Sequence, residues 1–201
     1  HIRDNLQLEP GEYRLMIKGN KVAGGELKPD CMLAMDPGNT LSKIEGTPTK
    51  EPAFGLDALW ISSAQKEEAE IAGYTVVDLP TVMATHLTEI IRTHSHEIFG
   101  RQEANNLIEN FKKQYPKVVE ELMPDPLSLG AIVRVLQNLL AEQVSIRDLL
   151  TIFETLADEV HKTKDPEVLT EAARKALARS ITVKYLDDEG SIGVMTLSPE
   201  V

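Results

Sequence analysis

The spacing of apolar residues changes near Thr81, and this change constrains the fold more strongly than any other feature of the sequence. Upstream of Thr81, short apolar runs alternate or cluster as strands do, and glycines and prolines separate them. Downstream, apolar residues recur three and four positions apart, which is the spacing of amphipathic helices. Strands with short helices followed by a run of helices are typical of the α+β class. We therefore predict an α+β chain made of several subdomains.

The first 80 residues predict a small mixed α/β unit. Strands are expected at EYRLMIKG (12–19), CMLAM (31–35), LDALWIS (56–62) and YTVVDLP (74–80). A short polar helix is expected over Ser63–Gly73. The paired glycines of Val22–Leu27 (VAGGEL) favour a turn between strands. Residues 38–55, with three glycines and two prolines, favour a long polar loop.

Most of residues 81–123 are expected to be helical. Thr81 fits an N-cap for a helix that Gly100 ends. A second helix is expected over Arg101–Tyr115, and a short helical piece over residues 117–123. Proline follows each of these two segments, as it does at many helix ends.

Three capped helices and a β-hairpin are predicted for the last third of the chain. Ser128, Ser145 and Asp165 each precede an amphipathic run, and Pro166 takes the first helical position after Asp165. Helices joined by such short links make a compact unit. The turn sequence Asp-Asp-Glu-Gly then predicts a hairpin over residues 181–198.

Composition excludes several classes of function. The net charge of −11 argues against a nucleic-acid partner, because phosphate binding is driven by a basic face. Cys31 is the single cysteine, which excludes an intramolecular disulfide and is typical of a reducing compartment. No apolar run approaches the roughly 20 residues that a membrane-spanning helix requires. The chain has no initiator methionine, and we interpret it as a fragment of a longer protein.

Three of the five histidines lie in MATHLTEIIRTHSHEIFG, residues 83–100. A zinc-protease helix carries two histidines four residues apart, whereas His94 and His96 are two apart and point about 200° away from each other. His86 and Glu89 share a face without a third ligand one turn further on. His94 falls on an apolar ladder formed by Met83, Leu87, Ile90, Ile91 and Ile98. We interpret the stretch as a packing helix with a hydrogen-bonded His94 at the edge of the core, and we predict no metal site.

No motif in the sequence argues for catalysis. The paired glycines are not followed by the Lys-Ser/Thr of a P-loop, and no Gly-x-Ser-x-Gly occurs. Cys31 is interpreted as a small buried hydrophobe, and Trp60 as a core residue and not a ligand platform. We predict a binding module without enzymatic activity or a cofactor. The alternative is a cytosolic enzyme with His, Glu and Asp side chains converging in one pocket at a subdomain junction.

Phe99 is a candidate for partner binding on the residues alone. It stands at the end of its predicted helix, directly before Gly100, where an aromatic side chain can line a cleft. Packing in the core is the more common role for such a residue.

Several stretches resemble the flagellar and virulence type III secretion export-gate family, the FHIPEP family. They are EPAFGLDALWI, GYTVVDLPTVMATHLTEII, HEIFGRQEANNLI, LSLGAIVRVLQNLLAEQVSIRDLLTIFETLAD and LTEAARKALARSI. The resemblance covers almost the whole chain in the same order, and it is looser over the first fifty residues. It implies the cytoplasmic part of a protein of the bacterial inner membrane, with a linker near His1–Leu8 that follows a transmembrane half.

The resemblance also implies four subdomains and a ring of nine subunits. The first subdomain would comprise residues 1–74 and 124–143, and the second would be a mainly helical insertion at 75–123. The third, helical and ring-building, would comprise residues 144–201, and the fourth would be missing. The fragment by itself is expected to be monomeric.

The resemblance implies that export chaperones with bound substrates, and components of the export ATPase complex, dock on this part of the protein. The dock is expected in a hydrophobic dimple between the first two subdomains. The family's key aromatic residue matches Phe99, and two nearby positions match His96 and Gly130, where relatives carry an acidic and a hydroxyl residue. Since neither type is retained, Glu97 and Ser128 are the alternative partner-binding residues.

Overall fold

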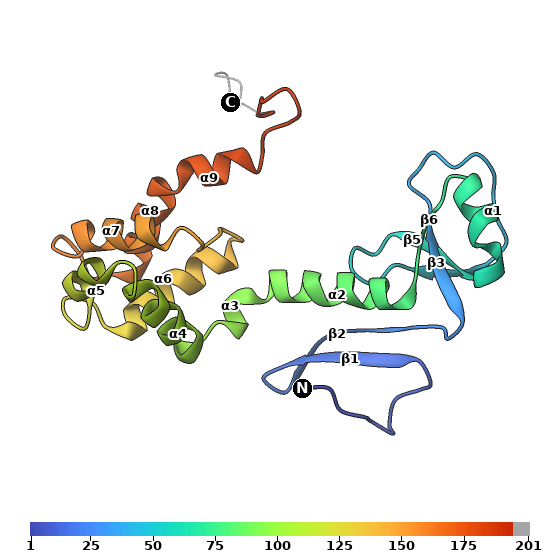
Figure 1. Ribbon diagram of the computed structural model, residues 1–201, viewed down its shortest axis with the longest axis horizontal. Helices are drawn as coiled ribbons and strands as arrows, with labels where there is room; N and C mark the ends of the chain where they lie inside the picture. Colours follow the sequence, from blue (N-terminus) through green and yellow to red (C-terminus); the bar gives the residue numbers. More distant parts are fainter. Residues whose placement is uncertain (195–201) are drawn as a thin grey trace, which may run out of the picture. The chain divides into compact units, whose positions relative to one another are not determined.

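The computed structural model describes residues 1–194, and the chain divides into two compact units, His1–His94 and a second that begins at Ser95. All strands found in the described residues belong to the first unit, whereas the second is helical (Figure 1). The predicted α+β class is confirmed.

The first unit contains an antiparallel hairpin and a four-stranded antiparallel sheet of order β4-β5-β3-β6. The strands are β1 (Glu12–Ile17), β2 (Asn20–Glu26), β3 (Cys31–Met35), β4 (Thr47–Lys50), β5 (Asp57–Ser62) and β6 (Thr75–Val77). A 3₁₀ turn, η1 (Ser63–Gln65), and helix α1 (Lys66–Ile71) follow β5. The predicted strands at residues 12–19, 31–35 and 56–62 and the short polar helix are confirmed. The fourth predicted strand, residues 74–80, is confirmed only over Thr75–Val77, because the next helix begins at Leu79.

The paired glycines lie inside strand β2, so the predicted turn was wrong. The hairpin register places Gly25 opposite Tyr13, and a Cβ atom on Gly25 would lie 2.8 Å from the phenolic oxygen of Tyr13. A Cβ atom on Gly24 would lie 2.7 Å from the carbonyl oxygen of Tyr13. A larger residue would have to displace the Tyr13 backbone carbonyl at position 24 or the Tyr13 ring at position 25, so glycine suits both positions.

The segment 38–55 is not all loop, because it contains strand β4. This strand pairs with β5 along one side only and forms an edge of the sheet. Its four residues, Thr-Pro-Thr-Lys, are mostly exposed, so no apolar alternation revealed them. Pro48 is tolerated there because an edge strand leaves one row of backbone groups unpaired.

The four-stranded sheet packs on both faces. Leu33 and Ala34 are neighbours in β3, and both are fully buried because successive side chains point to opposite faces. Leu33 packs with Trp60 and with Val82, which lies in the helix that follows β6. Ala34 packs with Ile61, with Ala69 of α1 and with Ala72 directly after α1. Trp60 is 5% exposed, which confirms its predicted place in the core.

Helix α2 (Leu79–Thr93) begins three residues earlier than predicted. Asp78 and not Thr81 is its N-cap, because the Asp78 Oδ1 atom accepts a hydrogen bond from the Thr81 N–H at 2.9 Å. The helix ends at His94, and a separate short helix, α3 (Ser95–Ile98), follows. The prediction of one continuous helix was therefore wrong.

The predicted apolar ladder of this region is only partly buried. Leu87 and Ile91 are 42% and 50% exposed, and the buried residues of α2 are Val82 and His86. His94 is half-buried, with its Nδ1 atom 2.9 Å from the Thr93 hydroxyl and 3.2 Å from the Ile90 carbonyl oxygen. The expected hydrogen-bonded histidine at the edge of the core is confirmed.

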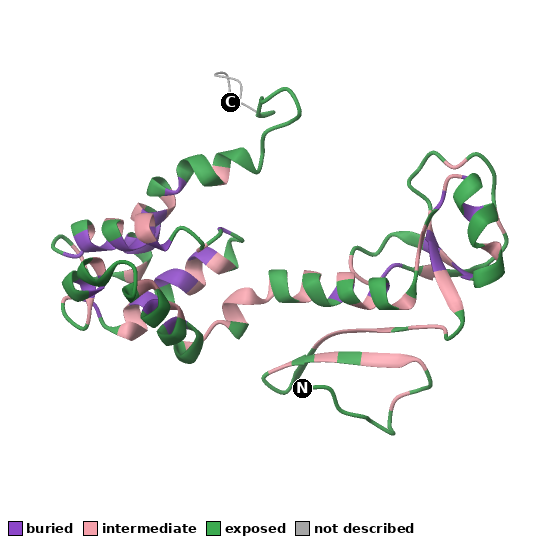
Figure 2. Cartoon of the chain, in the orientation of Figure 1, coloured by how far each residue is buried: buried purple, intermediate pink, exposed green. Residues whose placement is uncertain are grey.

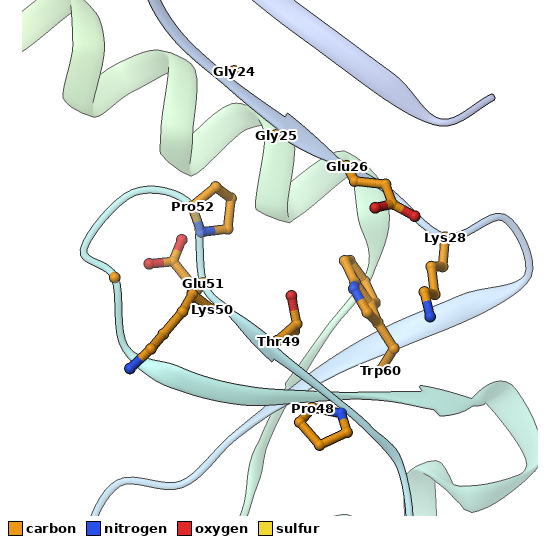
Figure 3. A pocket seen from close by; sticks show the side chains of 11 residues that line it. Gly24, Gly25, Glu26, Lys28, Pro48, Thr49, Lys50, Glu51, Pro52 and Trp60 are labelled. Atoms are coloured by element: carbon orange, nitrogen blue, oxygen red, sulfur yellow. The ribbon is translucent and has the colours of Figure 1, made fainter. Parts of the chain in front are cut away.

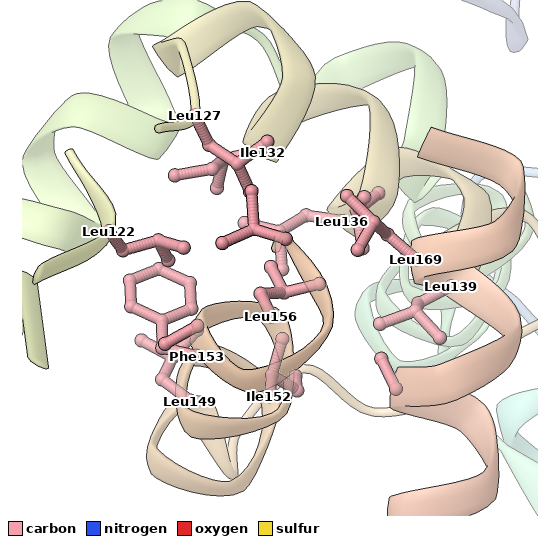
Figure 4. Close-up of a cluster of buried hydrophobic side chains, with 14 of the residues drawn as sticks. Leu122, Leu127, Ile132, Leu136, Leu139, Leu149, Ile152, Phe153, Leu156 and Leu169 are labelled. Atoms are coloured by element: carbon pink, nitrogen blue, oxygen red, sulfur yellow. The ribbon is translucent and has the colours of Figure 1, made fainter. Parts of the chain in front are cut away.

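The second unit is a bundle of helices around one apolar core. Its helices are α3, α4 (Arg101–Lys112), α5 (Pro116–Leu122), α6 (Leu129–Ala141), α7 (Leu149–Glu159), α8 (Pro166–Ala176) and α9 (Ala178–Val183). Buried residues follow one face of α6, α7 and α8 (Figure 2). Side chains from α5, α6, α7, α8 and the α5–α6 segment meet in the core, as Figure 4 shows for Leu122, Leu127, Ile132, Leu136, Phe153, Leu156 and Leu169.

Two of the three predicted caps in the second unit are confirmed. The Ser128 hydroxyl accepts from the Ala131 N–H at 3.2 Å, and the Asp165 carboxylate accepts from the Glu167 N–H at 2.9 Å. The third prediction was wrong, because Asp148 and not Ser145 caps α7.

The predicted hairpin was also wrong in its first arm. Residues 181–183 belong to helix α9, although a turn does follow, with the Gly190 N–H donating to the Asp187 carbonyl oxygen. The end of the predicted second arm, residues 195–198, lies outside the described residues.

Candidate partner-binding site

The five residues predicted to bind partners all lie in the second unit, on or next to α3 and α6. His96 and Glu97 belong to α3, and Phe99 follows it directly. Ser128 is the N-cap of α6, and Gly130 lies in the first turn of that helix. Helices α3 and α6 pack against each other.

Phe99 is held in place through its backbone. Its N–H donates to the Ser95 carbonyl oxygen at 2.8 Å, and its carbonyl oxygen accepts from the Gln137 side-chain amide at 2.8 Å. The side chain is half-buried and packs against the apolar core of the unit. An aromatic ring in this position has one side supported and one side open, which suits it to contact a partner.

The segment after Phe99 turns directly into α4. The Gly100 N–H donates to a Glu103 carboxylate oxygen at 2.9 Å, which caps the new helix. Arg101 then lies beside Gly130, because a Cβ atom on Gly130 would be 3.5 Å from the Arg101 guanidinium. That distance is ordinary van der Waals contact, so Gly130 has room for a small side chain.

Gly130 and Gln137 are seven residues apart in α6 and so share one face, about 10 Å apart along the axis. The Arg101 guanidinium lies near Gly130, and the Phe99 carbonyl oxygen accepts a hydrogen bond from the Gln137 side chain. The site is therefore a strip along α6. Sequence reasoning missed Gln137 and Arg101, since neither carries a motif of its own.

His96 has an unusual environment within the strip. Its Nδ1 atom is buried and has no hydrogen-bond partner among residues 1–194. Glu97, the next residue, is half-buried. A buried ring nitrogen without a hydrogen-bond partner costs free energy in the folded chain.

The histidine arrangement does not form a metal site. No group of three His, Cys, Asp or Glu side chains within residues 1–194 is placed to hold an ion. His86 instead contacts Tyr13, and burial lowers the pKa of His86 although the Glu51 carboxylate opposes this shift. Cys31 is half-buried and not fully buried as predicted, and it packs beside the Trp60 core.

A hollow of about 450 Å³ in the first unit lies over Trp60 (Figure 3). Residues 24–26 of β2 and residues 48–52 form its two sides, and Lys28 and Gly55 complete it. Its carboxylates are Glu26 and Glu51, and no histidine lines it. It therefore lacks the convergence of His, Glu and Asp that the alternative enzyme hypothesis requires.

Comparison with known proteins identifies the family. The model of the FHIPEP family matches residues 1–201, the whole chain. The chain belongs to the FHIPEP family. The flagellar biosynthesis protein FlhA of Bacillus subtilis is 54% identical over 200 residues, which are 100% of this chain and 30% of that relative. The chain therefore spans less than a third of the length of this FHIPEP protein.

Two solved structures support the fold. The Chlamydia pneumoniae CdsV protein, in a complex with CdsO, has a TM-score of 0.81 at 29% identity, over 100% of this chain and 61% of that one. Nonameric EPEC SctV-C has a TM-score of 0.66 at 27% identity, over 92% of this chain and 56% of that one. Within residues 1–194, no helix is both long enough and apolar enough to cross a membrane.

Proposed function

We propose that this chain is part of the docking platform of a flagellar type III export gate, on the cytoplasmic face of the bacterial cell membrane. It binds export chaperones loaded with substrates, and soluble export components, so that proteins are exported in order. Family membership and the 54% identity to a flagellar biosynthesis protein support this proposal. The structure of a CdsV and CdsO complex supports the proposal, because CdsV is similar to this chain and binds another protein.

The observation that carries the proposed site is the position of Phe99. Its backbone is fixed by hydrogen bonds at both ends, and its half-buried ring stands at the α3–α4 junction above α6. A partner helix placing an apolar anchor against this ring would complete its burial. His96 and Glu97 of α3, and Ser128 and Gly130 at the start of α6, would contact the polar residues of the partner.

The proposal includes assembly and subdomain organisation. A nine-subunit ring, as in SctV-C, would present nine copies of a weak site and raise the effective affinity for a partner. The subdomains would follow the division into residues 1–74 with 124–143, residues 75–123, and residues 144–201. We propose that the chain acts by non-covalent binding, without catalysis, and its membership of the FHIPEP family supports this.

The test is binding of a purified flagellar chaperone–substrate complex to Phe99→Ala, measured by calorimetry. We expect a loss of about 2 kcal/mol, roughly 30-fold in Kd, because a supported aromatic anchor is removed. Tyr185→Ala is a matched control, since Tyr185 is an aromatic residue of the second unit, 66% exposed and remote in sequence from the strip. Equal affinity of Phe99→Ala and wild type, with an unchanged circular dichroism spectrum, would remove Phe99 from the site.

A further inference from the structure

The loop Glu51–Leu56, here called the Phe54 loop, is built around a buried carboxylate. Glu51 is 3% exposed, and its two carboxylate oxygens accept hydrogen bonds from the N–H groups of Ala53 at 2.9 Å and Phe54 at 2.7 Å. The Gly55 N–H donates to the Glu51 carbonyl oxygen, and the Glu51 N–H donates to the Leu56 carbonyl oxygen, both at 2.8 Å. Four hydrogen bonds therefore fix a loop of six residues.

This rigid loop presents apolar side chains to solvent. Phe54 is 61% exposed and Leu56 is 52% exposed. Ordering a loop on binding costs free energy, and a loop that is already ordered avoids this cost. The hydrogen bonds to the Glu51 carboxylate fix the backbone at Ala53 and Phe54, from which the exposed Phe54 side chain projects. The arrangement is that of an interaction surface.

A shallow apolar hollow of about 310 Å³ lies on α8 and α9, here called the α8–α9 hollow. It is lined by Glu171, Arg174, Lys175, Ala178, Ile181 and Thr182, which recur at helical spacing along one face. Ala178 and Ile181 supply apolar surface, and the aliphatic stem of Arg174 adds to it. Arg174 is already paired with Glu142 and Glu171, whereas no ion pair within residues 1–194 involves Lys175.

We infer that the Phe54 loop of one copy of this chain docks in the α8–α9 hollow of the next copy. A closed ring is built from head-to-tail contacts, which need two different and complementary surfaces on each subunit. The loop is a projection and the hollow is a recess of matching apolar character. Asp57 beside the loop is 88% exposed in its pair with Lys50, an exposed pair of little strength, so it is available to Lys175 of the neighbouring copy.

The inference rests on the proposed ring assembly, and nonameric SctV-C shows that a structural relative forms such a ring. It goes further by naming which surfaces meet. A single contact between isolated fragments is weak, so the test must detect a transient encounter at high protein concentration.

Cysteine cross-linking between separate chains is the direct test. In a Cys31→Ser background, a chain with Phe54→Cys is mixed with a differently tagged chain with Ala178→Cys and oxidised. We expect this pair to give several-fold more heterodimer than Leu41→Cys with Ala178→Cys, or Phe54→Cys with Val168→Cys. Leu41 and Val168 are matched controls because they are exposed apolar residues of the same two units.

A second measurement does not depend on cysteine chemistry. In nuclear magnetic resonance spectra recorded over a concentration series, amides of residues 54–57 and 174–182 should shift together. Phe54→Ser should weaken the association about tenfold, because the side chain that fills the hollow is removed. Ala178→Gln should do the same from the other side.

Several results would overturn the contact. Equal cross-linking in the control pairs, homodimers from Phe54→Cys alone, or concentration-dependent shifts that Phe54→Ser leaves unchanged would each contradict it. Absence of both heterodimer and shifts would contradict it as well. The Phe99 binding experiment is independent, so a failure here leaves the proposed docking function in place.

Discussion

The phenolic oxygen of Tyr13 lies 2.6 Å from Nδ1 of His86, although the two residues are 73 positions apart in the chain. The rings meet edge to face with centroids 5.7 Å apart, and His86 is 3% exposed. Strand β1 is thereby tied to helix α2. The contact explains why a polar ring is buried on a helix whose apolar residues Leu87 and Ile91 are exposed.

Tyr13→Phe tests the strength of this contact. The variant keeps the ring but leaves a buried nitrogen of His86 without a partner, and we expect it to lower the free energy of unfolding by about 1–3 kcal/mol. Urea unfolding followed by the fluorescence of Trp60 is the measurement, because Trp60 is the single tryptophan and lies in the same unit. Tyr185→Phe is the control, and equal stability of the two variants would contradict the prediction.

The same site makes the first unit sensitive to acid. Burial lowers the pKa of His86 in the folded chain from its ordinary value of 6.5, so the unfolded chain binds a proton first as the pH falls. Stability should therefore decrease as the pH drops from 7.5 through 6.5 and level off below the lowered pKa. His86→Gln should remove this slope in urea titrations monitored by Trp60. A wild-type stability that rises on acidification would refute it.

The structure has Asp148 as the N-cap of α7, whereas the sequence predicted Ser145, and mutation of each residue can distinguish the two. The Asp148 carboxylate accepts from the Thr151 N–H at 3.1 Å, so Asp148→Ala should cost about 1 kcal/mol. Ser145→Ala should cost much less, because Ser145 lies outside the helix. Urea unfolding followed by far-ultraviolet circular dichroism compares the two. A larger loss for Ser145→Ala would mean that α7 begins earlier than the structure shows.

Phe153 is the largest fully buried side chain of the second unit. It contacts Phe111 edge to face, with ring centroids 5.2 Å apart. We expect Phe153→Ala to lower the free energy of unfolding by about 3–5 kcal/mol, since the lost contacts leave a cavity. Thermal unfolding by circular dichroism would show this as a lower Tm. Val168→Ala, at an exposed position of α8, should change little.

Elements with a strong local signal were predicted well from the sequence. Pro166 after Asp165 marked the start of α8, and the apolar run of β3 marked a buried strand. Trp60 was placed in the core because a lone large aromatic residue usually packs there. Each of these signals depends on one residue or on residues close together in the chain, so it can be recognised in the sequence.

The failures each depend on a distant contact. Gly24 and Gly25 were interpreted as a turn because nothing nearby in the sequence reveals that the Tyr13 carbonyl oxygen approaches Gly24 and the Tyr13 ring approaches Gly25. Strand β4 is polar and exposed, and only its pairing with β5 defines it. Ser145 and Asp148 are both good capping residues, and the sequence alone did not rank them.

The candidate site was predicted only in part. Phe99 drew attention as an aromatic residue before a glycine, and the other members came from family resemblance. Gln137 was missed because its role is to bind the carbonyl oxygen of Phe99, 38 positions away. Every residue has a backbone carbonyl oxygen, so the identity of residue 99 does not reveal this hydrogen bond and no sequence pattern could have predicted it.

Pro48 has a consequence for behaviour at high local concentration. An unprotected edge strand can pair with identical strands of other molecules, and the resulting aggregates are hard to reverse. Proline in β4 removes a donor that such recruitment would need. The protein should therefore tolerate a high local concentration without forming amyloid-like aggregates through strand β4.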